Sequence, residues 1–155
     1  MTSLSLASPL GRLTLTEEGG RIVSLNWGDG AAGEETPLLC RARDQLAEYF
    51  NGTRTDFTLP LAPEGTDFQR KVWDAMCAIP YGETRAYGDL ADDLSSSARA
   101  VGTACGRNPI PVIVPCHRVI GKSGALTGYT GAGGLATKQF LLVLEKGTTQ
   151  GVLAL

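Results

Sequence analysis

The stretch Ile113-Val114-Pro115-Cys116-His117-Arg118-Val119-Ile120 places the only histidine of the chain directly after a cysteine. The thiolate is the nucleophilic form of cysteine, and an unperturbed thiol with a pKa of about 8.5 is mostly protonated at neutral pH. We therefore expect His117 and Arg118 to lower the pKa of Cys116. Neighbouring side chains of an extended strand point to opposite faces, so Cys116 and His117 act together only if Pro115 breaks the strand or a water carries the proton.

A second interpretation of this stretch is purely structural. Cys116 would then be a small buried apolar residue and His117 a hydrogen-bonded residue of the core, which is the commoner role for an isolated Cys-His pair. The flanking segments decide between the two interpretations. Downstream, residues 119–126 predict a small hairpin that could serve as a wing against nucleic acid. Residues 127–134, with four glycines, form a loop that could close over a substrate or only connect two elements.

Upstream of this stretch, residues 87–94 and 98–105 predict two short helices joined by a serine turn at 95–97. This arrangement suits a helix-turn-helix, in which the second helix contacts DNA. Arg99 lies in the first turn of that helix beside small residues, which would permit close approach to a duplex. The alternative is an ordinary helical hairpin with an exposed arginine, and for two short helices alone it is the commoner case.

The first part of the chain predicts scaffold. Alternating apolar residues between positions 4 and 27, with a turn at 18–20, indicate antiparallel strands. Thr36 and Pro37 begin a helix that ends at Asn51-Gly52. Residues 57–64 carry two prolines and predict a linker. We therefore expect a small N-terminal α/β domain with an antiparallel sheet over residues 1–63, and a mainly helical domain over 64–155 that opens with a Thr66-Gln69 capping box.

Composition excludes several classes of protein. The chain has 155 residues, of which 43% are hydrophobic, and no apolar run of the roughly 20 residues that span a bilayer. Its four cysteines form no Cys-x-x-Cys pair, so neither a disulfide framework nor a zinc site is predicted. Because residues 1–20 show no basic, apolar leader, we expect an intracellular, cytoplasmic protein with reduced thiols.

Charge is distributed unevenly although the net charge is only −2. Residues 1–94 hold eight lysines and arginines against fifteen acidic residues, a charge of −7. Residues 95–155 hold six against Glu145 alone, a charge of +5. A cationic surface around Cys116 is therefore compatible with an acidic chain, although segregation alone is weak evidence.

Glu145 stands out on the last predicted helix, residues 135–146. A carboxylate near the negative, C-terminal end of a helix is unfavourable. This placement indicates that Glu145 has a partner elsewhere in the fold, for which His117 is the candidate.

Together these segments resemble the methylated-DNA cysteine methyltransferases, the alkylguanine-DNA alkyltransferases. Four motifs between about residues 66 and 147 occur in the order of that family: Ile79-Pro80-Tyr81-Gly82-Glu83-Thr84, Arg99-Ala100-Val101-Gly102, Asn108-Pro109 and Pro115-Cys116-His117-Arg118-Val119. The resemblance implies a C-terminal domain with a winged helix-turn-helix. It also implies repair of DNA by irreversible, single-event transfer of an alkyl group from O6-alkylguanine to Cys116, with O4-alkylthymine as a further candidate substrate.

The same resemblance implies a role for each matching residue. Cys116 would accept the alkyl group, His117 would be its base through a bridging water, and Glu145 would orient the histidine. Asn108 would brace the turn before the site, and Tyr87 would assist at the base rotated out of the duplex. Arg99 would fill the gap left by that base. Further DNA contacts are expected from Ala98, Ala100, Gly102, Thr103, Arg107 and Arg118, and the substrate pocket from Val119, Tyr129, Thr130 and Gly131.

The partner implied is double-stranded DNA carrying alkylated bases. No cofactor, metal, membrane or obligatory protein partner is expected, and the chain would act as a monomer associated with the nucleoid. The turn that precedes Arg99 is about two residues shorter than is usual in the family, and it follows the acidic pair Asp92-Asp93. Two other functions stay open: a cysteine hydrolase using the same side chains, and a winged-helix DNA-binding module without chemistry.

Overall fold

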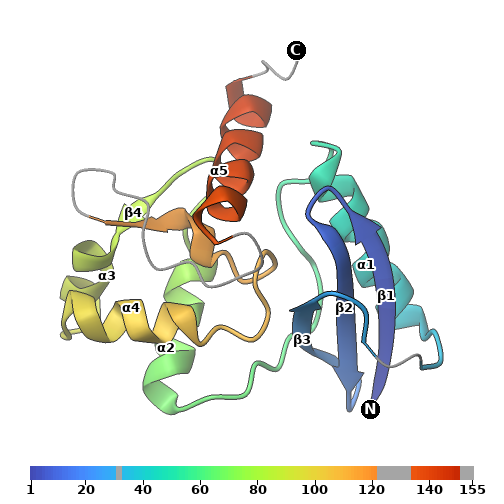
Figure 1. Cartoon of the computed structure of the whole chain (residues 1–155). Helices are drawn as coiled ribbons and strands as arrows, with labels where there is room; N and C mark the ends of the chain where they lie inside the picture. The colour runs from blue at the N-terminus through green and yellow to red at the C-terminus, as the bar shows by residue number, and fades with distance from the viewer. Residues whose placement is uncertain (31–32, 122–133, 151–155) are drawn as a thin grey trace. The chain divides into compact units, whose positions relative to one another are not determined.

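The computed structural model describes residues 1–30, 33–121 and 134–150, with side chains as far as residue 147. The chain divides into two compact units, Met1–Glu64 and Gly65–Leu155. The first unit holds a sheet and one helix, and the second is mainly helical (Figure 1). None of the helices that the structure describes is both long enough and apolar enough to cross a membrane.

The first unit contains a three-stranded antiparallel meander made of β1 (Thr2–Ser8), β2 (Gly11–Glu18) and β3 (Arg21–Trp27). Alternation along β2 places Leu13 and Leu15 on one face, and both are fully buried. Gly19 and Gly20 close the second turn with φ angles of +61° and +79°, which glycine adopts without a steric penalty. The predicted strands and the predicted turn at 18–20 are confirmed.

Helix α1 (Pro37–Phe50) packs on this sheet. Thr36 caps it by accepting a hydrogen bond of 3.0 Å from the backbone N–H of Leu39, and proline occupies the first helical position, as predicted. The apolar stripe of the helix is buried, with Leu39, Leu46 and Tyr49 fully covered. The helix therefore supplies the core of the first unit and none of the candidate site.

Residues 57–64, predicted as a linker, are in part bound to the sheet. The backbone N–H of Ile22 donates to the carbonyl of Pro60, and the N–H of Ala62 donates to the carbonyl of Ile22, both at 2.9 Å. The prolines are tolerated here because a sheet edge demands fewer backbone donors than a central strand. The segment predicted as a linker therefore pairs with β3 over part of its length and belongs to the first unit, Met1–Glu64.

The second unit is built from α2 (Asp67–Cys77), β4 (Arg85–Ala86), α3 (Tyr87–Asp93), α4 (Ala98–Gly106), the 3-10 turn η1 (Cys116–Arg118), β5 (Val119–Ile120) and α5 (Leu135–Gln150). Thr66 and Gln69 form the predicted capping box at the start of α2. The indole N–H of Trp73 donates to the carbonyl of Ala104 at 2.9 Å and so joins α2 to α4 within the core.

Helices α3 and α4 form the predicted helical pair with a serine turn. Ser95 lies in the left-handed region at φ +53°, and Ser97 caps α4 by accepting from the N–H of Ala100 at 3.1 Å. Val101 is fully buried, so α4 turns one face to the core and leaves the face of Arg99 exposed. The backbone at Ser95 is the one strained point of this turn among the described residues.

Strand β5 pairs in parallel with β4, while the second arm of the predicted hairpin lies outside the described residues.

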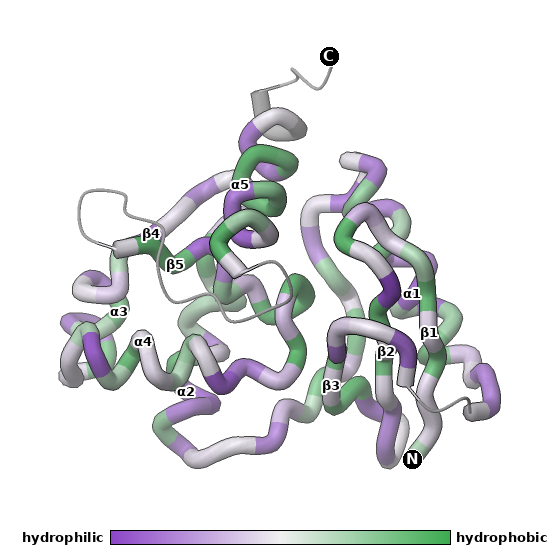
Figure 2. The backbone as a smooth tube through the Cα atoms, viewed as in Figure 1, coloured by the Kyte–Doolittle hydropathy of each residue, from purple (hydrophilic) through white to green (hydrophobic). Residues whose placement is uncertain are grey.

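Along α5 apolar residues are interrupted by polar ones (Figure 2). Lys138, Leu141 and Glu145 follow each other at spacings of three and four residues, and each is at most 1% exposed. This buried stripe carries two charged residues into the core.

Candidate active site

The turn at Cys116 brings adjacent side chains into one buried region. The N–H of Cys116 donates to the carbonyl of Val114 at 2.8 Å, and the N–H of Arg118 donates to the carbonyl of Pro115 at 3.0 Å. Residues 116–118 then form a 3-10 turn in place of an extended strand. Cys116 is 8% exposed and His117 fully buried. The break at Pro115 that joint action requires is present.

Asn108 holds the loop that leads to this turn. Its side-chain amide donates to the carbonyl of Val114 at 2.8 Å, and its side-chain oxygen accepts from the N–H of Ile110 at 2.9 Å. Val112, within the same loop, has a φ of +74°, which is costly for a β-branched residue. Such a conformation persists only where its surroundings impose it, so the loop is held in one shape before Cys116.

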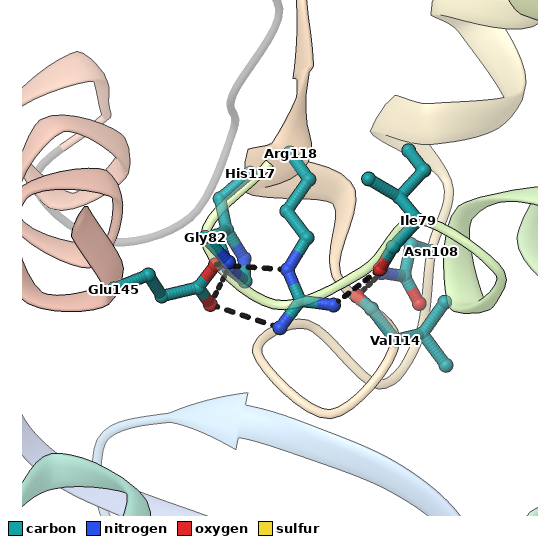
Figure 3. Close-up of polar contacts among 7 residues, drawn as sticks. All are labelled: Ile79, Gly82, Asn108, Val114, His117, Arg118 and Glu145. Carbon is teal, nitrogen blue, oxygen red and sulfur yellow. Dashed lines mark hydrogen bonds and ion pairs between the residues drawn. The ribbon is translucent and has the colours of Figure 1, made fainter. Parts of the chain in front are cut away.

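Glu145 reaches from α5 to the same turn (Figure 3). Its Oε2 lies 2.6 Å from Nε2 of His117. Arg118 donates two hydrogen bonds to the carboxylate, from Nε to Oε1 at 2.9 Å and from Nη2 to Oε2 at 3.1 Å. The backbone N–H of Gly82 adds a longer bond of 3.3 Å to Oε1. Three charged or polar groups from two segments therefore converge on one buried carboxylate.

These contacts set the protonation states of the cluster. Burial raises the pKa of Glu145, but the hydrogen bonds from His117 and Arg118 and the charge of Arg118 outweigh it and lower the pKa to about 2. Burial lowers the pKa of His117, and the charges of Arg118 and Lys138 lower it further against the opposing effect of Glu145. At neutral pH, His117 is uncharged. Because an ionised carboxylate only accepts, Nε2 carries the proton and Nδ1 is left as an acceptor.

The Nδ1 atom of His117 is buried and has no hydrogen-bond partner among the described residues. An unsatisfied buried acceptor is costly and is common at sites of chemistry. It is the atom that could take a proton from Cys116, the residue before it in the turn.

The pKa of Cys116 corrects a prediction. Burial raises the pKa of the thiol, and the hydrogen bond from Asn108 and the charge of Lys138 lower it only in part. The expected lowering by Arg118 and His117 is wrong for two reasons: Glu145 neutralises the guanidinium, and the imidazole is itself uncharged. Cys116 therefore rests as a thiol and needs a base to react.

Arg118 also corrects a prediction, that of a DNA contact. The residue is 7% exposed, its Nη1 donates to the carbonyl of Ile79 at 2.8 Å, and its guanidinium lies 5.6 Å from the ring centre of Tyr81. Its Nε and Nη2 donate to the carboxylate of Glu145. With its donors directed inward, Arg118 presents no fork to a phosphate.

Lys138 is a site residue that the sequence analysis missed. It is fully buried on α5, and its ammonium donates to the carbonyl of Val119 and lies 3.5 Å from the Tyr87 hydroxyl. Burial lowers the pKa of Lys138, while the thiol groups of Cys116 and Cys105 act in the opposite direction. The available signal was its spacing of seven residues from Glu145, which puts both on one helical face.

The remaining predicted site residues fall into two groups. Ala98, Arg99, Thr103 and Arg107 are exposed on or just after α4, whereas Gly102 lies 4.0 Å from the Tyr87 ring, measured from a Cβ built on the glycine. Val119 is fully buried, and its carbonyl faces Lys138. The predicted pocket residues Tyr129, Thr130 and Gly131 lie outside the described residues.

An open hollow of about 430 Å³ adjoins the exposed face of α4. It is lined by Thr66, Phe68, Gln69, Ser97, Arg99, Ala100, Thr103 and Ala104. The charge of the acidic pair Asp92-Asp93, which precedes α4, is partly neutralised because Asp93 forms a 2.8 Å ion pair with Arg85. Within the described ranges, no group of three His, Cys, Asp or Glu side chains is placed to hold a metal ion.

Two family models match this chain. The model of the 6-O-methylguanine DNA methyltransferase DNA binding domain matches residues 67–147, and that of the ribonuclease-like domain of 6-O-methylguanine DNA methyltransferase matches residues 3–63. The constitutive methylated-DNA–protein-cysteine methyltransferase of Bacillus subtilis is 48% identical over 152 residues, covering 90% of this chain and 92% of the relative. The Mycobacterium tuberculosis protein of the same name is 48% identical over 151 residues, covering 92% and 90%.

Solved structures give the same result. The Mycobacterium tuberculosis O6-methylguanine methyltransferase aligns with a TM-score of 0.84 and 45% identity over 95% of this chain and 93% of that one. A structure of the methyltransferase from that organism in complex with DNA aligns with a TM-score of 0.86 and 46% identity, covering 96% and 94%. The Methanococcus jannaschii O6-methylguanine DNA methyltransferase aligns with a TM-score of 0.69 and 30% identity, covering 92% and 93%.

Proposed function

This chain belongs to the 6-O-methylguanine DNA methyltransferase family, and from that membership we propose that Cys116 is the residue that takes the alkyl group from damaged DNA. The protein is a transferase that repairs DNA by moving an alkyl group from DNA to a cysteine. The observation that supports Cys116 is the buried Glu145–His117 pair: among the described residues, the remaining ring nitrogen of His117 has no partner, and it belongs to the same turn as the thiol.

The first step is deprotonation of the thiol. The Sγ proton of Cys116 passes to Nδ1 of His117 through a bridging water, and Glu145 stabilises the imidazolium that forms. A base of this kind is required because burial raises the pKa of the thiol above its ordinary value. The nearby ammonium of Lys138 favours the thiolate once it has formed.

The second step is displacement at the alkyl carbon. The thiolate forms a C–S bond while the bond between the alkyl carbon and guanine O6 breaks, and the electron pair moves to the base. Tyr87, within 3.5 Å of the Lys138 ammonium, donates a hydrogen bond to the leaving base, which regains a proton from the site. A thioether is a very poor leaving group, so each chain reacts once.

Access to the alkyl carbon requires rotation of the nucleotide out of the duplex, at a cost of a few kcal/mol. We assign this to α4, whose exposed start carries Arg99 beside Ala98 and Ala100. The guanidinium of Arg99 would occupy the vacated position in the stack and offset part of that cost. Thr103 and Arg107, also exposed, would contact the backbone of the DNA.

The decisive experiment is incubation with an oligonucleotide that contains O6-methylguanine, followed by peptide mass spectrometry. We expect a mass gain of one CH2 group on the peptide of Cys116 and stoichiometric loss of the lesion. Cys116→Ser should take up no label, and the matched variant Cys77→Ser, at an exposed cysteine of the same unit, should react as the parent does. Repeated turnover without a lasting mass gain would indicate a hydrolase, and DNA binding without label a non-catalytic module.

A further inference from the structure

Arg118 has a role in this site that goes beyond the proton relay. We propose that Arg118 is a positioning residue for alkyl transfer: it fixes Glu145 and supplies the countercharge that keeps His117 neutral and able to accept a proton. This inference rests on the proposed function. Arg118, which the sequence predicted to contact DNA, thereby acts inside the fold.

Geometry supports the positioning half of the proposal. Arg118 contacts both oxygens of Glu145, at 2.9 and 3.1 Å, so the carboxylate cannot rotate without losing a bond. The guanidinium is itself anchored by the carbonyl of Ile79 at 2.8 Å and by the face of the Tyr81 ring at 5.6 Å. The two bonds from Arg118 thereby hold the carboxylate in the orientation in which Oε2 meets Nε2 of His117.

Charge supports the second half. Glu145 is 1% exposed, and a buried carboxylate needs a compensating positive charge. Among the described ion pairs of Glu145, the groups that could supply that charge are the guanidinium of Arg118 and a protonated His117. If His117 supplied it, Nδ1 would already carry a proton, and the base would be lost. Arg118 meets the demand permanently because a guanidinium does not deprotonate in proteins.

Within the part of the chain that the structure describes, few charged and titratable groups surround His117, so the contribution of Arg118 to its pKa can be measured. Glu145 and Lys138 face it from α5, and Cys116 and Arg118 belong to its own turn. From α2, Cys77 lies within the field of Arg118. Of these groups, Arg118 and Lys138 disfavour protonation of His117 and Glu145 favours it. Removal of the Arg118 charge leaves the attraction of Glu145 opposed mainly by burial.

The test uses His117 itself, the only histidine of the chain, whose imidazole signals need no further assignment in NMR. In the parent we expect a neutral ring with the proton on Nε2 at pH 7. In Arg118→Met the apparent pKa of His117 should rise by about 1–3 units. Arg118→Lys retains the charge but loses the fork, so it should restore most of the parent titration. The double variant Arg118→Met/Glu145→Gln should also titrate low, because the carboxylate that demands a countercharge is gone.

Alkyl transfer is measured in parallel, with free O6-benzylguanine as the substrate. Because this substrate involves no DNA, a change in DNA affinity cannot alter the measured rate. The acid limb of the rate against pH should move upward in Arg118→Met by the same number of units as the histidine titration. An unshifted histidine titration in a folded Arg118→Met chain would overturn the proposal and leave Arg118 a packing residue. A charged His117 in the parent at pH 7 would overturn it even if the variant failed to fold. Absence of label on Cys116 in the parent would instead refute the proposed function and leave the histidine titration interpretable.

Discussion

The sequence predicts a DNA contact for both Arg99 and Arg118, and the folded chain treats the two arginines in opposite ways. Arg99 is exposed near the start of α4 and forms no ion pair with the residues that the structure describes. Arg118 is 7% exposed and bound on three sides by Glu145, Ile79 and Tyr81. A positive residue close to a reactive cysteine is therefore not evidence of a phosphate contact until its burial is known.

The two environments also differ in what a charge does. An exposed arginine is screened by water and salt, and its ion pairs contribute only about 0–1 kcal/mol. A buried pair interacts strongly, and removal of one partner leaves the other unpaired at a cost of about 3–5 kcal/mol. The buried charges of Arg118 and Glu145 can therefore fix the protonation state of His117. The exposed charge of Arg99 on α4 is suited instead to contacts with DNA phosphates in varying positions.

The largest effect is expected in the interior, for Glu145→Gln. We expect alkyl transfer to slow by about 10²–10⁴-fold, the usual contribution of an oriented base, because a neutral amide lacks the negative charge that stabilises the imidazolium of His117. Affinity for unmodified duplex DNA should change far less. Single-turnover rates and binding isotherms measure the two quantities, and Glu83→Gln, at an exposed carboxylate of the same unit, is the matched control. Equal transfer rates for Glu145→Gln and the parent would remove Glu145 from the relay.

Glu145→Gln should also change how the stability of the chain depends on pH in the acid range. The pKa of Glu145 in the folded chain, about 2, lies below its ordinary value of 4.5. The stability that this carboxylate contributes is present above about pH 4.5 and is lost as the pH falls toward 2. Glu145→Gln should be less stable than the parent at pH 7, since Arg118 loses its partner, and should lose less of its stability between pH 4.5 and 2. Urea unfolding at several pH values separates this loss from a general folding defect.

An intermediate effect is expected at the surface, for Arg99→Ala. Transfer from duplex DNA should slow by about tenfold, which corresponds to about 1.4 kcal/mol, while transfer from free O6-benzylguanine stays near the parent rate because a free base needs no rotation. The slope of log K against log salt should become shallower by about 1 if Arg99 also neutralises a phosphate. Arg21→Ala, at an exposed arginine of the first unit, serves as the control. An equal loss on both substrates would make Arg99 structural.

The smallest effect is expected at Ser95, in the turn that leads to Arg99. Ser95 has a φ of +53°, a conformation that glycine adopts more easily. Ser95→Gly should stabilise the chain by about 0.5–1 kcal/mol, which corresponds to a rise in Tm of roughly 1–4 °C. Ser96→Gly, beside it and without a positive φ, should be neutral or destabilising. A Ser95→Gly chain no more stable than the parent would show that the turn is not under strain.

Local signals explain why the elements themselves were predictable. The caps at Thr36 and Thr66 involve donors no more than three residues away, so the residue types alone specify them. The alternation around Leu13 and Leu15 specifies which face of β2 is buried. The segment at residues 57–64 was not predictable, because its bonds go to Ile22, far away along the chain.

Glu145 shows how a correct expectation can rest on an incorrect premise. The sequence predicts a helix that ends near residue 146. Because a carboxylate is unfavourable at the C-terminal end of a helix, a partner for Glu145 was inferred. Helix α5 continues to Gln150, so Glu145 does not lie at the end. Its contact with His117 arises instead from the buried stripe with Lys138 and Leu141. The periodicity of three and four residues was visible in the sequence and would have indicated Lys138 as well.

The sequence by itself determined the residue types available for the chemistry, a cysteine followed by the single histidine and a carboxylate on the last helix, and the motif order that identifies the family. Only the tertiary structure decided which arginine is buried, that Lys138 enters the core, and that Cys116 rests as a thiol. The reason is physical. Hydrogen bonds within a turn depend on neighbours in sequence, whereas the pKa of a side chain and the strength of a charge depend on desolvation and on groups brought from distant segments.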